Sequence, residues 1–212
     1  MATSKALPTA DTTKEAKVLF SSTLQVILER LPVRSRSIVE ARFGIGSETP
    51  KTLEEIGKSY QITRERVRQV IGSALGFLSG EKAHPSIGQV VDSIEQTLSE
   101  RHGVMKSEDL LQELSLESKK ERGALLAFLE ALSIVKEEKM TKEYERLYRL
   151  KSFSLTRFKK IKDKAKAILE EVQDALEADD LYARFKKVDA EVTREELFDM
   201  LSVSREVKQN VF

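Results

Sequence analysis

Hydrophobic residues recur every three to four positions along most of the chain, so the sequence predicts a mainly α-helical protein. The first such stretch runs from about Lys14 to Arg30, and its apolar face is formed by Leu24, Ile27, Leu28 and the following Leu31. Pro32 marks the start of the next predicted helix. Residues 1–13 lack this periodicity and are rich in alanine, threonine and serine, so we expect them to form a disordered arm.

Residues 52–70 predict two short amphipathic helices joined by a tight turn. Thr52 and Glu55 form a capping box at the start of the first helix. Gly57 is the small residue needed where this helix crosses close to the second one, and Thr63 is a good N-cap for the second. The apolar residues are spaced so that all of them face inward; they are Ile56, Tyr60, Ile62, Val67 and Val70. This pattern is typical of a helix-turn-helix.

The second of these helices carries polar residues on its outward face: Arg64, Glu65, Arg66, Arg68 and Gln69. Arginine can form two hydrogen bonds with guanine, glutamine pairs with adenine edges, and glutamate accepts a hydrogen bond from cytosine. Charged residues that alternate with apolar ones usually form only a solvated helix face. Here the glycine, both caps and the inward spacing all agree, which favours a helix that reads the major groove of DNA.

Three segments together resemble region 4 of primary-type bacterial sigma factors over about residues 20–78. They are Leu31 to Ile45, Thr52 to Gly57 (Thr-Leu-Glu-Glu-Ile-Gly) and Thr63 to Gln69 (Thr-Arg-Glu-Arg-Val-Arg-Gln). The resemblance implies recognition of the −35 promoter element. It also implies that region 4 docks on the flap of the RNA polymerase beta subunit, so double-stranded promoter DNA and RNA polymerase are the expected partners.

The resemblance assigns roles to individual residues. It implies that base edges and adjacent groups are contacted by Arg64, Glu65, Arg66, Arg68 and Gln69. Phosphate contacts are implied for Arg34, Arg42 and Thr63, together with the N-terminus of the second helix.

The chain departs from the family pattern at the end of this segment. Ile71 stands where the family usually has glutamate, and residues 76–81 contain no basic residue where the family continues with a basic tail. Fewer phosphate contacts predict weak DNA binding by the chain alone. Ile71 and Phe77 leave two alternatives open, an apolar surface that faces a partner or part of the core.

Residues 80–85 have the composition of a linker. Beyond them, residues 86–150 predict three helices, followed by a two-stranded wing at Ile134-Val135 and at Tyr144 to Leu150. Three helices and a wing indicate a winged helix. We expect few contacts to cross the linker, so that residues 86–150 fold independently of residues 14–80.

Residues 154–212 repeat the same order of helices, with a capping box at Thr193 and Glu196. The chain stops at Val211-Phe212, where a second wing should follow, which predicts an incomplete or truncated second unit. At the level of pattern alone, residues 86–212 resemble the winged-helix module of the RNA polymerase delta subunit and HARE-type modules. The alternative is that they are ordinary helical packing domains.

The overall charge is nearly balanced, with 36 basic and 35 acidic residues and a formal net charge of +1. A dedicated non-specific DNA binder is normally more basic. The densest basic run is Lys159 to Lys166, which could contact nucleic acid but is more often a solvated helix face.

Composition also excludes several function classes. The sequence has no cysteine and only two histidines, which argues against disulfides and structural metal sites. It has no apolar run of membrane-spanning length and no secretory signal, so we expect a cytoplasmic, nucleoid-associated protein. No arrangement of residues indicates catalysis, a phosphate-binding loop or a cofactor.

These patterns predict a helix-turn-helix domain at residues 14–80, a winged-helix unit at 86–150 and a second, incomplete unit at 154–212. The first hypothesis is a DNA-binding bacterial transcription protein that reads promoter DNA and associates with RNA polymerase. The alternative is a protein-interaction module that docks on RNA polymerase or a regulatory partner with little DNA binding of its own. A third hypothesis is a nucleic-acid-linked regulator of a defence or restriction system.

Overall fold

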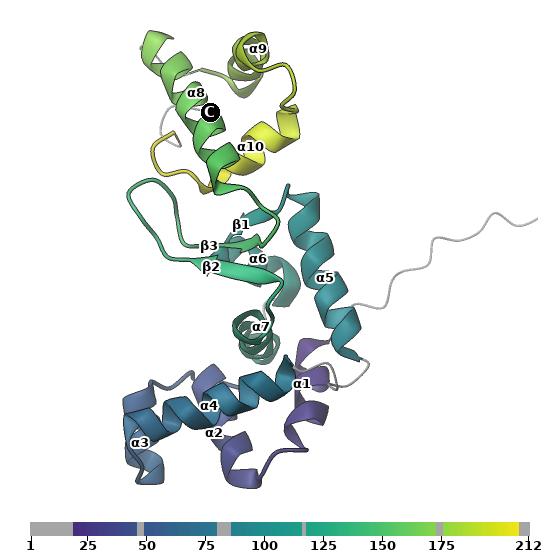
Figure 1. Ribbon diagram of the computed structural model, residues 1–212, viewed down its shortest axis with the longest axis vertical. Coiled ribbons are helices and arrows are strands. Elements are labelled where there is room, and N and C mark those ends of the chain that lie inside the picture. The colour runs from purple at the N-terminus through teal and green to yellow at the C-terminus, as the bar shows by residue number, and fades with distance from the viewer. Residues whose placement is uncertain (1–18, 46–48, 80–85, 116–117, 173–175, 208–212) are drawn as a thin grey trace, which may run out of the picture.

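The computed structural model describes residues 19–45, 49–79, 86–115, 118–172 and 176–207. The predicted arm, the predicted linker and the Val211-Phe212 end lie outside these residues. The described part is mostly helical, as the hydrophobic periodicity predicted, and is stacked in three tiers (Figure 1). Within it, no helix is long and apolar enough to cross a membrane.

The first tier contains four helices, α1 (Phe20–Leu28), α2 (Val33–Phe43), α3 (Leu53–Tyr60) and α4 (Arg64–Leu78). Pro32 occupies the N-cap position of α2, as its sequence position predicted. Gly44 ends that helix in the left-handed conformation, with φ of 67°, which glycine adopts without strain.

The middle tier has the helix and strand order of a winged helix. It contains α5 (Ser86–Glu100), β1 (Val104–Lys106), α6 (Ser107–Ser115), α7 (Lys119–Ala131), β2 (Val135–Glu138) and β3 (Leu147–Leu150). The strands form one antiparallel sheet in the order β1-β3-β2, with Val104 opposite Arg149 and Val135 opposite Leu150. The predicted wing is therefore confirmed as β2 and β3.

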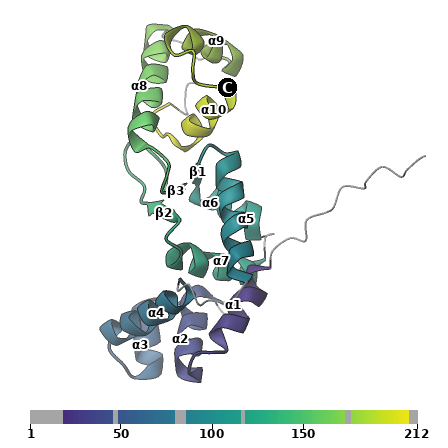
Figure 2. The ribbon, with the colours of Figure 1, turned by 45° about the vertical axis from the view of Figure 1, so that its right-hand side comes forward.

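The third tier contains α8 (Leu155–Val172), α9 (Ala178–Val188) and α10 (Arg194–Val203), which lie on the other side of the sheet (Figure 2). The central strand β3 is buried along its whole length. Its Tyr148 and Leu150 belong to the core of the first two tiers, whereas Leu147 joins Val104 in the core of the third tier. The sheet thus separates two hydrophobic cores and contributes to both.

The first two tiers share a single hydrophobic core. This core extends from Phe20 to Leu150 and includes buried residues on both sides of the 80–85 segment. Helix α7 packs against α1, α2 and α4, which makes it the link between the tiers. The expectation that few contacts would cross this segment is therefore wrong. The physical reason is that α7 buries residues around most of its circumference: Glu121, Gly123, Ala124, Leu125, Ala127, Phe128 and Leu129.

A buried carboxylate joins the N-termini of α1 and α7. Glu121 accepts hydrogen bonds from the backbone N–H of Ser21, at 3.1 Å, and from the Ser21 hydroxyl. The N-cap residue of α1, Leu19, has no side chain that can cap the helix. Glu121, 100 residues away in the sequence, instead accepts a hydrogen bond from the backbone N–H of Ser21 at the start of α1. Both side chains are buried, so neither group can exchange its partner for water.

The basic run of α8 is engaged in ion pairs rather than forming a free cationic face. Lys162 is buried and lies 2.9 Å from Glu206, 3.4 Å from Asp163 and 3.7 Å from Glu143. Burial alone would lower the pKa of Lys162, but the hydrogen bond with Glu206 and the neighbouring carboxylates raise it above its usual value. Lys162 therefore stays charged and holds the wing loop, through Glu143, and the segment after α10, through Glu206, against α8.

We predict that replacing Glu121 with alanine lowers the free energy of unfolding by about 1.5–3 kcal/mol, the range for losing a hydrogen bond to a charged group. The reason is that the buried Ser21 hydroxyl and the N-terminus of α1 both lose their acceptor. Thermal or urea unfolding followed by circular dichroism measures the change. Glu95→Ala, at an exposed position of α5, is the matched control and should change stability little. Equal stability of the two variants would contradict the role of Glu121.

Candidate nucleic-acid interface

The first helix of the helix-turn-helix, α3, begins at the predicted capping box. The hydroxyl of Thr52 accepts from the Glu55 N–H at 3.2 Å, and the Glu55 carboxylate accepts from the Thr52 N–H at 2.7 Å. The hydrogen bonds from the Thr52 backbone and hydroxyl hold the pKa of Glu55 below its usual value. The two interactions satisfy two otherwise free backbone groups and fix the start of α3.

The turn between α3 and α4 depends on Gly57. The Ile62 N–H donates to the Gly57 carbonyl at 3.0 Å, which brings the two helices together. A Cβ atom at position 57 would lie only 2.8 Å from the Ile62 carbonyl oxygen, so a side chain there would force the helices apart. Gln61 completes the turn in the left-handed conformation with φ of 53°. The predicted need for a small residue at position 57 is confirmed.

Helix α4 is oriented by its buried face. Thr63 caps the helix by accepting from the Arg66 N–H at 3.1 Å. The side packed into the core is formed by Val67, Ile71, Ala74, Leu75 and Leu78. Because these residues fix the rotation of the helix about its axis, the opposite side faces solvent. All five residues implied to read bases are exposed there: Arg64, Glu65, Arg66, Arg68 and Gln69.

Four of these five side chains form one network. Both oxygens of the Glu65 carboxylate accept from the Arg68 guanidinium, at 2.7 and 2.8 Å, and Oε1 also accepts from the Gln69 amide at 3.5 Å. Arg66 donates to Gln69 at 3.2 Å. The hydrogen bond from Arg68 lowers the pKa of Glu65, so the carboxylate stays ionised at neutral pH. Exposed pairs of this kind contribute little stability, so their donors and acceptors can be exchanged for base edges.

The residues implied to contact phosphates lie in two different places. Arg34 donates to the Tyr60 carbonyl at 2.7 Å, which puts its guanidinium beside the turn that precedes Thr63. Arg42 instead donates to the Lys51 carbonyl at 3.2 Å and lines a cleft of about 720 Å³ between α2 and α7. Its positive charge partly offsets the raised pKa of Glu130, which comes mainly from burial of that carboxyl group. Arg34 thus lies beside the turn that leads to Thr63, whereas Arg42 lies at the cleft beside α7.

The turn also contains two groups that the sequence did not single out, Lys58 and Gln61. With Glu54 and Arg64 they line a shallow pocket of about 340 Å³ at the N-terminus of α4. No sequence signal marks Gln61, because a left-handed glutamine follows no motif and is fixed only by the packing of the turn. The same packing determines that the Tyr60 carbonyl receives Arg34.

The second half of α4 is less polar than the first. Ile71 is buried, so of its two alternatives the core is correct, whereas the Phe77 side chain is 40% exposed. Gly72 and Gly76 lie on the exposed side, where an added Cβ atom would meet nothing within 4 Å. The last turn of α4 carries no basic residue. The groups able to contact DNA are therefore concentrated in the first two turns of the helix.

A comparison with known protein families agrees with this geometry. Residues 27–78 match the family model of sigma-70, region 4. The match spans α2, α3 and α4, together with the end of α1, and covers about a quarter of the chain. It supports a sigma-like, DNA-binding role in transcription for this helix-turn-helix, and the family is a non-enzymatic transcription factor domain.

We predict that Gly57→Ala destabilises the helix-turn-helix by about 1–3 kcal/mol, the range for inserting a methyl group into a tightly packed site. The methyl group would clash with the Ile62 carbonyl, which belongs to the backbone and cannot rotate away. Gly88→Ala in α5 is the control, because nothing lies within 4 Å of its Cβ position and alanine favours a helix. Unfolding curves that are identical for the two variants would show that the close approach at position 57 is not required.

Proposed function

We propose that the sigma-70 region 4 domain of this chain reads promoter DNA of the −35 type by placing α4 in the major groove, and that the protein works together with RNA polymerase. The observation that carries this proposal is the outward face of α4, where three arginines, a glutamate and a glutamine are exposed on a helix with a fixed rotation. Such a face has donors for guanine and adenine edges and an acceptor for cytosine.

Base contacts would replace the existing side-chain network. Arg66 and Gln69 hold each other, as do Arg68 and Glu65, so each side chain already points along the helix face before DNA arrives. Positioning of this kind reduces the entropy lost when a side chain is immobilised on a base. Replacing these side-chain hydrogen bonds costs little free energy, because each one that breaks is replaced by a hydrogen bond to a base edge.

Phosphate contacts would come from the turn side of the domain. Arg34 lies beside the turn, and the N-terminus of α4 presents backbone N–H groups with the positive end of the helix dipole. These contacts position the helix on the duplex without reading sequence. Arg42 would reach a phosphate only from its place on the cleft beside α7, so we assign it the smallest part.

A second function has its own support. Phe77 is exposed, the last turn of α4 has no basic residue, and the net charge of the chain is only +1. These features favour an apolar docking surface for RNA polymerase, including the flap of its beta subunit, with little DNA binding by the chain alone. The salt dependence of binding distinguishes the two functions. A complex held by phosphate contacts weakens steeply as the salt concentration rises, whereas an apolar interface does not.

We predict that Arg66→Ala and Gln69→Ala each relax sequence preference, at about 1–3 kcal/mol for each lost base contact. The measurement is the affinity of the full chain for a −35-like duplex and for a scrambled duplex at matched salt. Arg184→Ala, an exposed arginine on α9, is the control and should alter neither affinity. If both α4 variants bind the two duplexes as the unchanged protein does, readout by this helix is wrong.

We also predict that the full chain binds even its preferred duplex weakly, with Kd in the micromolar range or above at physiological salt, as is typical of few phosphate contacts. RNA polymerase should raise the affinity, because a second attachment increases the effective concentration of α4 at the DNA. Titration of one duplex with and without polymerase measures this effect. Nanomolar binding by the chain alone would show that the missing basic tail does not lower the affinity for DNA.

A further inference from the structure

The middle tier raises the question of which of its surfaces are available to a ligand. In a helix-turn-helix module the helix after the turn is the one that enters the major groove. In this tier that helix is α7, and the β2-β3 wing is the other projecting element. A winged helix that reads DNA through this helix and its wing needs both of them exposed. In this protein each is covered by another part of the same chain.

Helix α7 is covered by the sigma region 4 domain. A Cβ atom at Gly123 would lie 2.4 Å from the Phe43 carbonyl oxygen, so α7 and the end of α2 are in direct backbone contact. On another side of the helix, the buried Glu121 is bonded to Ser21, and Phe128 packs on Phe20 with ring centroids 6.4 Å apart. A double helix of DNA cannot approach α7 along these sides while the region 4 domain is in place.

The loop of the wing, residues 139–146, is covered by the third tier. Tyr144 pairs with Ser204 in an antiparallel bridge, flanked by the Glu145 N–H donating to Val203 and the Arg205 N–H donating to Glu143, both at 2.9 Å. The Arg205 guanidinium also donates to the Thr141 carbonyl at 3.1 Å. The segment after α10 therefore adds to the wing as a short strand would.

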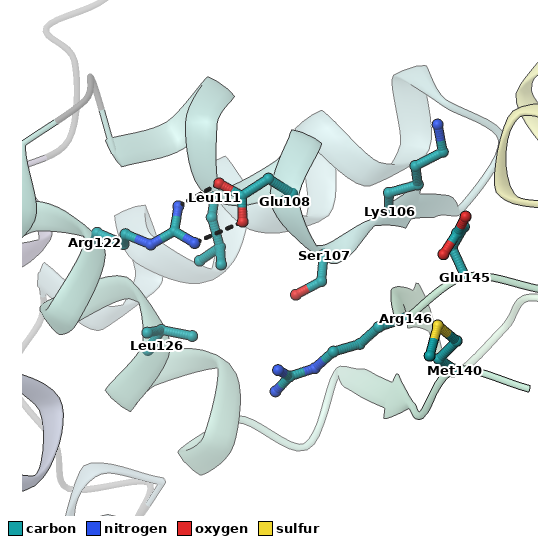
Figure 3. A pocket seen from close by; sticks show the side chains of 9 residues that line it. All are labelled: Lys106, Ser107, Glu108, Leu111, Arg122, Leu126, Met140, Glu145 and Arg146. Carbon is teal, nitrogen blue, oxygen red and sulfur yellow. Dashed lines mark hydrogen bonds and ion pairs between the residues drawn. The ribbon is translucent and has the colours of Figure 1, made fainter. Parts of the chain in front are cut away.

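Two arginines beside the wing are already paired with carboxylates. Figure 3 shows the pocket of about 400 Å³ beneath the wing, where Arg122 forms two hydrogen bonds with Glu108, at 2.7 and 3.0 Å. Arg146, which points into the same pocket, is paired with Glu137. Cations that are neutralised in this way gain little from a phosphate, because contact with DNA would leave a carboxylate beside the backbone of the nucleic acid.

From these contacts we propose that the winged-helix unit is an internal docking frame. Its α7 holds the region 4 domain, its wing holds the α8–α10 unit, and neither element contacts DNA. The consequence for binding rests on the proposed function: the chain reads DNA at a single helix, α4, and the frame fixes where the α8–α10 unit stands relative to that helix.

A reversible covalent lock on the wing tests this proposal. The chain has no cysteine, so Tyr144→Cys with Ser204→Cys introduces only one pair of thiols. Residues opposite each other in this kind of bridge, without mutual backbone bonds, have Cα atoms about 4.5 Å apart, within the range for a disulfide. Within the described ranges the Ser204 hydroxyl has no hydrogen-bond partner, so its replacement removes no hydrogen bond there. Tyr144→Cys alone controls for the lost ring contact with Phe158.

The full chain is oxidised, its free thiols are counted, and its affinity for a −35-like duplex is compared with that of the reduced form. We expect the disulfide to form and the two affinities to agree within about twofold. Thiols that stay free would overturn the proposal, because the wing would not be docked. A loss of tenfold or more in the locked form, restored by reduction, would also overturn it, because the wing would have to leave α10 to bind DNA.

Matched charge changes give a second measurement. Lys119→Gln with Lys120→Gln removes the exposed lysines of α7, and Lys136→Gln with Lys139→Gln removes two of the three exposed lysines of the wing, leaving Lys142. We expect both pairs to leave affinity and its salt dependence unchanged, whereas Arg64→Gln with Arg66→Gln should weaken binding. A shallower salt slope in either lysine pair would overturn the proposal.

The proposed function can fail separately. If no form of the chain binds the duplex, with or without polymerase, promoter reading by α4 is wrong. The thiol count then still decides whether the wing is docked.

Discussion

The contact between α7 and the region 4 helices is the interaction on which the rest of the structure depends. Gly123 brings the backbone of α7 against the end of α2, and Glu121 supplies the acceptor that the N-terminus of α1 lacks. The first is a steric requirement and the second an electrostatic one. Together they join the first two tiers into one core, and they fix the direction in which α4 faces.

The sheet extends this coupling to the third tier. Because side chains of a strand alternate between its two faces, a three-stranded sheet can contribute to two cores at once. Here Tyr148 packs in the core of the first two tiers, where burial raises its pKa to about 12. Leu147 packs in the core of the third tier. On the edge of the third-tier core, His102 contacts Asp199 at 2.6 Å, and Arg157 forms two hydrogen bonds with Glu196. The three tiers are thus joined by packing on both faces of one strand.

Local signals in the sequence predicted most elements of the fold and most of the helix-turn-helix site. Capping residues such as Thr52 and Thr63 act within three or four positions, so their effect is visible in sequence, and so is the need for Gly57. Strand β1 was not predicted because three residues are too few to show a period. No local pattern in the sequence marks Glu121, because its partner Ser21 is 100 positions away and only the tertiary structure brings the two residues together.

The same limit explains the wrong expectation about the linker and the different positions of the arginines. The composition of residues 80–85 gives no information on what α7 packs against. The sequence gives no reason to distinguish Arg34 from Arg42. Because they lie at opposite ends of α2, Arg34 lies beside the turn and Arg42 lies at the cleft beside α7.

The distribution of charge has a consequence for how such a protein finds its site. In the third tier, Arg157, Lys164 and Arg194 are each held by a carboxylate within 3.0 Å, so their fields cancel at short range. On α4, neither Arg64 nor Arg66 forms an ion pair with a carboxylate of the residues that the structure describes, which leaves a small local excess of positive charge at the start of the helix. A field this small does not attract DNA over a long distance through physiological salt. If α4 reads DNA as proposed above, selectivity comes from the few groups on α4, and most of the binding free energy comes from a partner that brings this helix to its site.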